Sequence, residues 1–233
     1  MICCLARHGK DDNTVRGGWS QQPLTDEGKA QADELASFIQ RGDLGIKHIY
    51  SSDLLRATQT AQSVADKLHL PIIPMQEFRE VNNGDLAGMK NDLASKMYPG
   101  LYWNTLGWEQ RYPDGESPKE FYERISTAWD AFQKMVLEQN ENVMLVTHGG
   151  VINVILSIVS GEKYSNGELQ LAIAIRRPLF LKQRLRNLQR NTDSSLMNTR
   201  CLFVANGFLS LTQQSCTKQP PMGRKRLMMK SLI

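Results

Sequence analysis

The stretch VMLVTHGGVINVILSIV, residues 143–159, contains the two signals that decide the fold. Its first four residues, Val143 to Val146, form an apolar run of the length of a buried strand. A short polar loop follows, and from Gly149 to Val159 the chain is again apolar, over a length that predicts a helix. A strand that passes through a short loop into a helix is the repeating unit of α/β proteins.

The same alternation of strand and helix signals recurs on the N-terminal side of this stretch. Thr25 and Asp53 are placed to cap two helices, and Gly42 stands just past the end of the first. We therefore expect an α/β fold, a three-layer α/β/α sandwich with a mostly parallel central sheet. The predicted segments are strands at 2–6, 48–50 and 71–75 (the last at a sheet edge), helices after Thr25 and Asp53, an irregular region at 76–117, and a long helix from Pro118 to Glu138.

The overall composition is that of a globular protein. The 233 residues (26.4 kDa) are 41% hydrophobic and 22% charged, which argues against fibrous and wholly disordered chains. No apolar stretch approaches the roughly 18 residues of a membrane span, and the short uncharged run before Arg7 is no secretion signal. The four cysteines have neither disulfide nor zinc spacing. These features predict a cytoplasmic protein that does not interact with membranes.

Charged residues are distributed unevenly along the chain. Residues 1–175 contain 16 basic and 23 acidic side chains, whereas residues 176–233 contain 12 basic side chains and a single acidic one, Asp193. Such a change in composition indicates two differently built segments. We place one domain at residues 1–165 and an atypical basic C-terminal extension at residues 166–233.

Three explanations fit this basic extension. It could be a disordered segment that contacts an acidic partner such as nucleic acid, an inert tail, or the product of a shifted reading frame or of recombination. We favour the last explanation, because tryptophan and tyrosine are absent after residue 175 and acidic residues almost vanish. Within the extension, Leu169 to Ile175 is the remaining candidate strand. The sequence does not predict an oligomeric state.

Three loops follow predicted strands, and each carries a charged or imidazole side chain. In open α/β sheets, ligands bind at the carboxyl ends of the strands, which here selects Arg7 to Gly9, Ser51 to Arg56, and Thr147 to Gly150. Arg56 stands in the first helical turn, where the helix dipole disfavours a cation unless an anion is nearby. Two glycines after His148 lead into a helix N-terminus, which also favours an anion. Together these loops predict an anion site that contains histidines.

A metal site is the competing interpretation of this cluster, since His8 and His148 could both be ligands. Two arginines close by argue against a dication, because each would repel it by several kcal/mol at about 4–5 Å, even at an effective dielectric constant near 20. A phosphate group reverses that sign, and arginine binds phosphate oxygens in a bidentate geometry. We therefore expect a phosphate site without a metal ion.

The motifs in these loops resemble those of the histidine phosphatase superfamily, the phosphoglycerate mutase-like proteins. An isolated Arg-His-Gly would be weak evidence, but five motifs occur in the family's order, each at a predicted element boundary. The resemblance covers residues 1 to about 163. The motifs are Leu5 to Gly9, Pro23-Leu24-Thr25 with Gly28, Ser51 to Ala61, Phe78-Arg79-Glu80 with Gly84 and Gly88, and Val146 to Gly150.

The resemblance implies a role for each candidate residue. His8 would be the nucleophile that forms a phosphohistidine, while Arg7, Arg56 and His148 would hold the phosphoryl oxygens and stabilise the transition state. Glu80 would protonate the leaving oxygen and then activate water. The attacking nitrogen of His8 must be neutral, which a hydrogen bond from its other nitrogen to a backbone carbonyl would enforce. Such chemistry requires no metal ion and no cofactor.

Two features bear on which member of the family this chain resembles. Only 67 residues separate Glu80 from His148, which is short for a mutase, so we expect a phosphatase of small phosphorylated metabolites. A mutase-type phosphotransferase and a non-catalytic phosphate-binding module remain as alternatives. Lys10 and Asp11 stand where the family usually has an acidic residue and threonine. The loop that follows is shortened, and Asn13 is the candidate for an additional phosphate contact.

Overall fold

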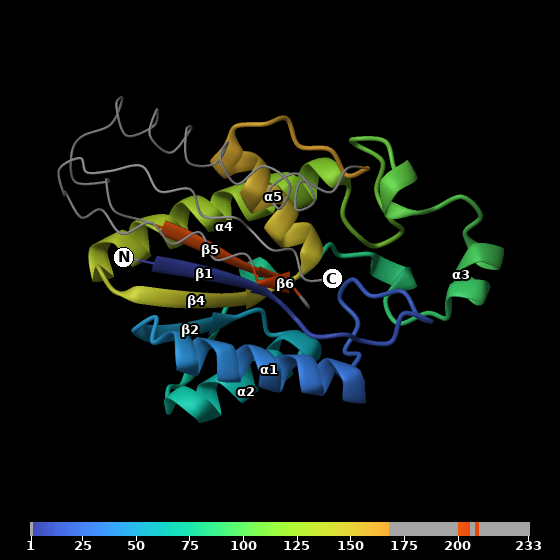
Figure 1. Ribbon diagram of the computed structural model, residues 1–233. Coiled ribbons are helices and arrows are strands. Elements are labelled where there is room, and N and C mark those ends of the chain that lie inside the picture. The colour runs from blue at the N-terminus through green and yellow to red at the C-terminus, as the bar shows by residue number, and fades with distance from the viewer. Residues whose placement is uncertain (1, 168–199, 206–207, 210–233) are drawn as a thin grey trace, which may run out of the picture.

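The computed structural model describes residues 2–167, 200–205 and 208–209, and it has a central sheet between two layers of helices (Figure 1). The strands follow the order β3-β2-β4-β1-β5-β6, and every neighbouring pair is parallel except β5 with β6. The expected mostly parallel sheet is confirmed. The strands are β1 (Ile2–Arg7), β2 (Ile46–Ser51), β3 (Ile72–Pro74), β4 (Asn142–Thr147), β5 (Arg200–Ala205) and β6 (Phe208–Leu209).

Each face of the sheet has its own hydrophobic core, because successive side chains of a strand point to opposite faces. Cys3 and Leu5 of β1 pack on the face covered by α4 and α5, whereas Cys4 and Ala6 pack on the face covered by α1 and α2 (Figure 1). The strands between these layers are therefore apolar on both sides, as buried parallel strands are. The helices are α1 (Asp26–Gly42), α2 (Leu55–Leu68), α3 (Asn91–Met97), α4 (Pro118–Gln139) and α5 (Gly149–Ser160).

Helix starts follow local hydrogen bonding, which confirms two predictions and corrects one. The Thr25 hydroxyl accepts the Gly28 N–H at 3.1 Å and caps α1 as expected, and Pro118 is the first residue of α4. Asp53 does not cap α2; that helix begins after Leu54. The Asp53 carboxylate is instead bound by the Arg79 guanidinium, with one contact at 2.6 Å, and so is not available to the helix.

One further helix boundary and one region of the chain differ from expectation. Gly42 is the last residue of α1 rather than the residue beyond it, and Asp43 terminates the helix with φ +40°. The region 76–117, expected to be irregular, contains α3, whose seven residues are too few to give a clear periodic pattern. The same region also contains three single-turn 3-10 helices, η1 (Gln76–Phe78), η2 (Gly84–Leu86) and η3 (Trp103–Thr105).

The basic extension contributes β5 and β6 to the sheet, with Arg200 of β5 opposite Ile2 of β1. The candidate strand Leu169 to Ile175 lies outside the described residues. The division of the chain at residues 165 and 166 therefore stays a prediction. Among the described helices, none is long and apolar enough to cross a membrane.

The sheet register brings the polar loops together. Arg7, the last residue of β1, lies opposite Thr147 of β4, and Ser51 of β2 lies opposite Val146. The three loops that follow these strands thus emerge at one edge of the sheet, where ligands bind in open α/β folds.

The loop after β1 is in backbone contact with helix α1. A Cβ atom at Gly9 would overlap the carbonyl oxygen of Gly28, and a Cβ at Gly28 would overlap the carbonyl oxygen of Lys10. Only glycine fits at both positions, because any side chain would push the helix and the loop apart.

Candidate active site

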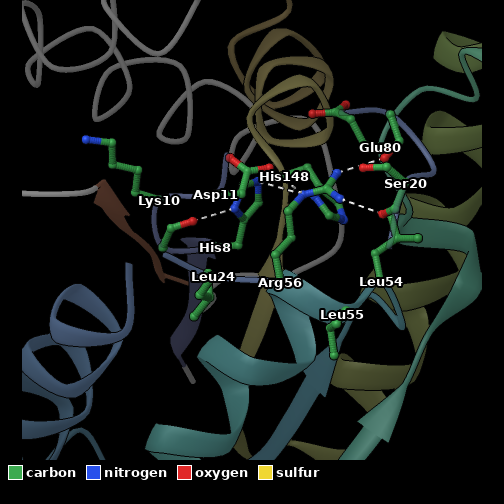
Figure 2. A network of polar contacts seen from close by, with 12 residues as sticks. His8, Lys10, Asp11, Ser20, Leu24, Leu54, Leu55, Arg56, Glu80 and His148 are labelled. Carbon is green, nitrogen blue, oxygen red and sulfur yellow. Dashed lines mark hydrogen bonds and ion pairs between the residues drawn. The ribbon is translucent and has the colours of Figure 1, made fainter. Parts of the chain in front are cut away.

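His8 is placed at the edge of the sheet directly after β1, and its side chain is buried (4% exposed). Its Nδ1 lies 2.7 Å from the carbonyl oxygen of Gly9, which can only accept a hydrogen bond. Nδ1 therefore carries the ring proton, and Nε2 carries the lone pair. That pair faces the Arg56 guanidinium, whose Nε is 3.3 Å from Nε2 (Figure 2).

The surroundings keep the imidazole of His8 neutral. Burial, the positive charge of Arg56 and that of Arg7 lower the pKa of His8 to about 3, from an ordinary value of 6.5. A neutral imidazole with Nε2 unprotonated is the nucleophilic form of histidine. The backbone hydrogen bond predicted for the nucleophile is thus present in the structure.

Arg56 is one of the largest fully buried side chains (1% exposed). Its two terminal nitrogens donate to the carbonyl oxygens of Gly18 and Ser20, at 2.8 and 3.0 Å. Burial lowers the pKa of Arg56, whereas Glu80 and Asp11 oppose that effect; a guanidinium nonetheless remains charged at neutral pH. These carbonyl contacts fix the planar group in one orientation beside His8.

His148 is the residue directly before α5 and is completely buried. Its Nε2 is 2.8 Å from the Ser52 hydroxyl, and that hydroxyl oxygen already accepts the Leu54 N–H. A hydroxyl can donate and accept at the same time; we assign the Ser52 proton to Nε2 of His148, which leaves the ring proton of His148 on Nδ1. Nδ1 is buried and has no hydrogen-bond partner in the described part of the chain.

The imidazole of His148 is also uncharged. Burial, followed by the neighbouring His8 and by Arg56, lowers the pKa of His148 well below its usual value. The rings of His8 and His148 lie close together, with centroids 5.1 Å apart. The site therefore contains one imidazole, His8, whose Nε2 lone pair faces Arg56, and a second imidazole, His148, whose Nδ1 has no hydrogen-bond partner in the described part of the chain.

Glu80 lies in the loop between η1 and η2, and two backbone N–H groups hold its carboxylate. The Gly150 N–H in the first turn of α5 and the Val81 N–H each donate to it at 3.1 Å. A Cβ atom at Gly150 would overlap this carboxylate, so glycine is required for the approach. The Trp19 indole N–H also donates, at 2.7 Å, to the main-chain carbonyl of Glu80.

Arg7 and Asn13 are exposed members of the predicted set. Arg7 lies beside the start of α5, because a Cβ atom at Gly149 would be 3.5 Å from its Nε. The main-chain carbonyl of Asn13 accepts a hydrogen bond, at 2.7 Å, from the side-chain amide of Asn91 at the start of α3. The structure thus brings Arg7, His8, Arg56, Glu80 and His148 together, while phosphate contact by Asn13 stays a prediction.

Three polar residues in the site were not predicted from the sequence. Ser52 is the partner of His148, and Thr60 links the nucleophile loop to α2 by accepting the Gly9 N–H at 3.0 Å and donating to the Arg56 carbonyl. Asp11 places its carboxylate 3.3 Å from the Nε of Arg56. Ser52 and Thr60 lie within the Ser51 to Ala61 motif, which was the available signal.

Comparison with known proteins identifies the family. A family model described as histidine phosphatase superfamily (branch 1) matches residues 3–173. The chain belongs to this superfamily. Its members bear names of both phosphatases and mutases, so the protein is a histidine phosphatase superfamily enzyme of one of these two kinds.

Three proteins similar to this superfamily enzyme carry both kinds of name. A Bacillus subtilis protein named uncharacterized phosphatase PhoE is 31% identical over 68% of this chain and 77% of its own. Phosphoglycerate mutase-like protein 4 of Arabidopsis thaliana is 34% identical over 64% of this chain and 66% of its own. The crystal structure of the alpha-ribazole phosphatase from Shigella flexneri is 25% identical, with a TM-score of 0.60 over 68% of this chain and 79% of that protein.

Proposed function

We propose that this superfamily member is a phosphomonoester hydrolase that acts on small phosphorylated metabolites through a phosphohistidine on His8. The observation that carries the proposal is the pair of contacts to His8. Nδ1–H is held by the Gly9 carbonyl, and the lone pair on Nε2 accepts a hydrogen bond from Nε of the buried Arg56. A neutral nucleophile beside a fixed cation suits attack on an anionic phosphoryl group.

The first step transfers the phosphoryl group to the protein. Nε2 of His8 attacks phosphorus, and the bond between phosphorus and the ester oxygen breaks. The leaving oxygen takes a proton from the Glu80 carboxyl group. Arg7 and Arg56 stabilise the negative charge on the phosphoryl oxygens, and the Nδ1–H of His148 donates to one of them, which satisfies the buried proton described above.

The second step returns the enzyme to its starting state. The Glu80 carboxylate removes a proton from water, and the water oxygen attacks phosphorus. The bond between phosphorus and Nε2 of His8 then breaks, which releases inorganic phosphate. The imidazole is again neutral, with its proton on Nδ1.

The experiment that tests this proposal measures phosphate release from a panel of phosphorylated metabolites, with His8→Ala as the control. Rapid quenching with a radiolabelled substrate should trap label on His8 that is acid-labile and stable to base. His8→Ala should abolish both turnover and label. Substantial hydrolysis by His8→Ala, or the absence of label in an active preparation, would show that the nucleophile is another group.

The same assay distinguishes the alternatives. Transfer of label to an acceptor without release of phosphate would indicate a mutase-type phosphotransferase, the activity suggested by the name of the Arabidopsis relative. Binding of phosphate esters without label on His8 and without turnover would indicate a phosphate-binding module. The presence of His8, Glu80 and His148 in one site favours catalysis.

A further inference from the structure

A second carboxylate faces the cation beside the nucleophile. Oδ2 of Asp11 lies 3.3 Å from Nε of Arg56, and the same Nε lies 3.3 Å from Nε2 of His8. Asp11 is largely buried (22% of its side chain exposed), and Figure 2 shows it above His8, next to the Arg56 guanidinium. The Asp11 carboxylate and Nε2 of His8, the atom that attacks phosphorus, therefore lie against the same nitrogen of Arg56.

Neighbouring contacts hold this carboxylate in place. The Lys10 N–H donates to the Gln31 side chain and the Lys10 carbonyl accepts the Thr25 N–H, both at 2.9 Å. Asp11 itself forms an isolated antiparallel bridge with Leu24. The backbone at Lys10 and Asp11 is thus held against α1 and the segment before it, which keeps Asp11 next to the site.

The nearest lysine does not neutralise Asp11. The Lys10 ammonium group is ion-paired with Glu27 of α1, and Figure 2 shows its side chain directed away from the histidines. The charged side chains that the structure places beside His8 therefore include two arginines, Arg7 and Arg56, and the carboxylate of Asp11. A threonine in place of Asp11 would leave the arginines with one opposing charge fewer.

We propose that Asp11 is a specificity-determining residue, which favours phosphate monoesters with a neutral or cationic leaving group and rejects those with a second anionic group close to the ester. This inference rests on the proposed hydrolase function and names its substrate class. Asp11 lies against Arg56, one of the arginines assigned to the phosphoryl group, and a leaving group attached to a phosphoryl group held there would pass within range of the Asp11 carboxylate. When two negative charges are this close in a partly buried site, they repel each other strongly, and here they are the Asp11 carboxylate and an anionic group on the leaving group.

The test compares three small esters that differ in the charge of the leaving group: phosphoethanolamine (cationic), glycerol 3-phosphate (neutral) and 3-phosphoglycerate (anionic). Both kcat/KM and the dissociation constant are measured for each. We expect the wild-type protein to prefer the first two over the third. Asp11→Asn, which keeps the shape and removes the charge, should raise kcat/KM for 3-phosphoglycerate relative to glycerol 3-phosphate by about tenfold.

Asp12→Asn is the matched control. Asp12 is the next residue and is exposed, and it accepts the Thr14 N–H at 2.8 Å, a hydrogen bond that asparagine retains. This variant should leave the ratio between the two esters within about twofold, because a solvated charge is screened. A ratio that shifts equally in both variants would mean that net charge, and not the position of Asp11, sets the preference, and would overturn the proposal.

A second measurement needs no variant at all. If the preference of the wild-type protein arises from charge, it should weaken as the salt concentration rises.

An unchanged ratio of kcat/KM between the two esters in folded Asp11→Asn, or a wild-type preference for 3-phosphoglycerate, would refute the role of Asp11. Failure of the hydrolase proposal gives a different result, namely binding of the esters without phosphate release; the order of the dissociation constants then still tests Asp11.

Discussion

The Ser52 hydroxyl determines which nitrogen of His148 carries the proton, and its removal is the most informative perturbation of the site. In Ser52→Ala, Nε2 of His148 loses its only described donor, at 2.8 Å. The ring proton is then free to move from Nδ1 to Nε2. A phosphoryl oxygen that approaches Nδ1 would meet an electron pair in place of a proton, so the transition state would lose one donor.

The magnitude follows from the burial of both groups. Ser52 and His148 are fully buried, and an unsatisfied buried polar group costs about 1–3 kcal/mol. Expressed as a rate, this corresponds to a decrease in kcat of about 5- to 150-fold. The substrate KM should change much less, because Arg7 and Arg56 still bind the phosphoryl group.

Ser157→Ala is the matched control for Ser52→Ala. Ser157 is equally buried, in α5, and its hydroxyl donates to the Val154 carbonyl at 2.7 Å, away from the histidines. Both variants should lose comparable stability in thermal unfolding, while only Ser52→Ala should lose activity. Long-range proton–nitrogen NMR of the His148 ring reports which nitrogen is protonated. An unaltered His148 tautomer together with unaltered kcat in Ser52→Ala would refute the reasoning.

Three further predictions concern the same site. Gly150→Ala introduces a Cβ atom that overlaps the Glu80 carboxylate, so kcat should fall by about 10- to 100-fold. In the control Gly149→Ala, the new Cβ comes no closer than 3.5 Å to Arg7, and kcat should fall far less. Equal decreases of kcat in the two variants would exclude displacement of Glu80 as the cause. The pKa of His8 is about 3 in the folded protein and near 6.5 in the unfolded protein, so on acidification the unfolded state binds a proton first. The free energy of unfolding should therefore fall as the pH is lowered from about 6.5 towards 3. For this one group the decrease is up to about 1.4 kcal/mol per pH unit. His8→Asn should show a shallower dependence in denaturant titrations, and identical slopes would contradict the assigned cause. Treatment with EDTA should leave turnover unchanged, since the arginines provide the positive charge; a loss restored by a divalent cation would show that a metal ion takes part.

Much of the fold could be predicted because its signals are local. The apolar run of β4 and the apolar helix after it are continuous in the sequence, and the Thr25 cap needs only the N–H three residues later. The cap predicted at Asp53 was wrong for the opposite reason. Its carboxylate is bound by Arg79, 26 residues away, and no local pattern indicates that partner.

In the candidate site, too, some residues could be predicted from local signals and others could not. Arg7, His8, Arg56 and His148 are found by asking which polar residues follow buried strands, and their association follows from the parallel sheet. The roles of Ser52 and Asp11 depend on which atom of a distant residue lies opposite, 96 positions away for the Ser52 contact with His148. Asp11 was recognisable in the sequence as a departure from the family pattern, but its contact with Arg56 was not.

The interlocked glycines of the β1 loop and α1 have a consequence for anyone who wishes to alter this enzyme's substrate range. The loop that follows the nucleophile contacts α1 through backbone atoms, at Gly9 and Lys10 on one side and Gly28 on the other. Diversified libraries should therefore leave both glycines fixed and place their variation at Asp11, whose side chain faces the site.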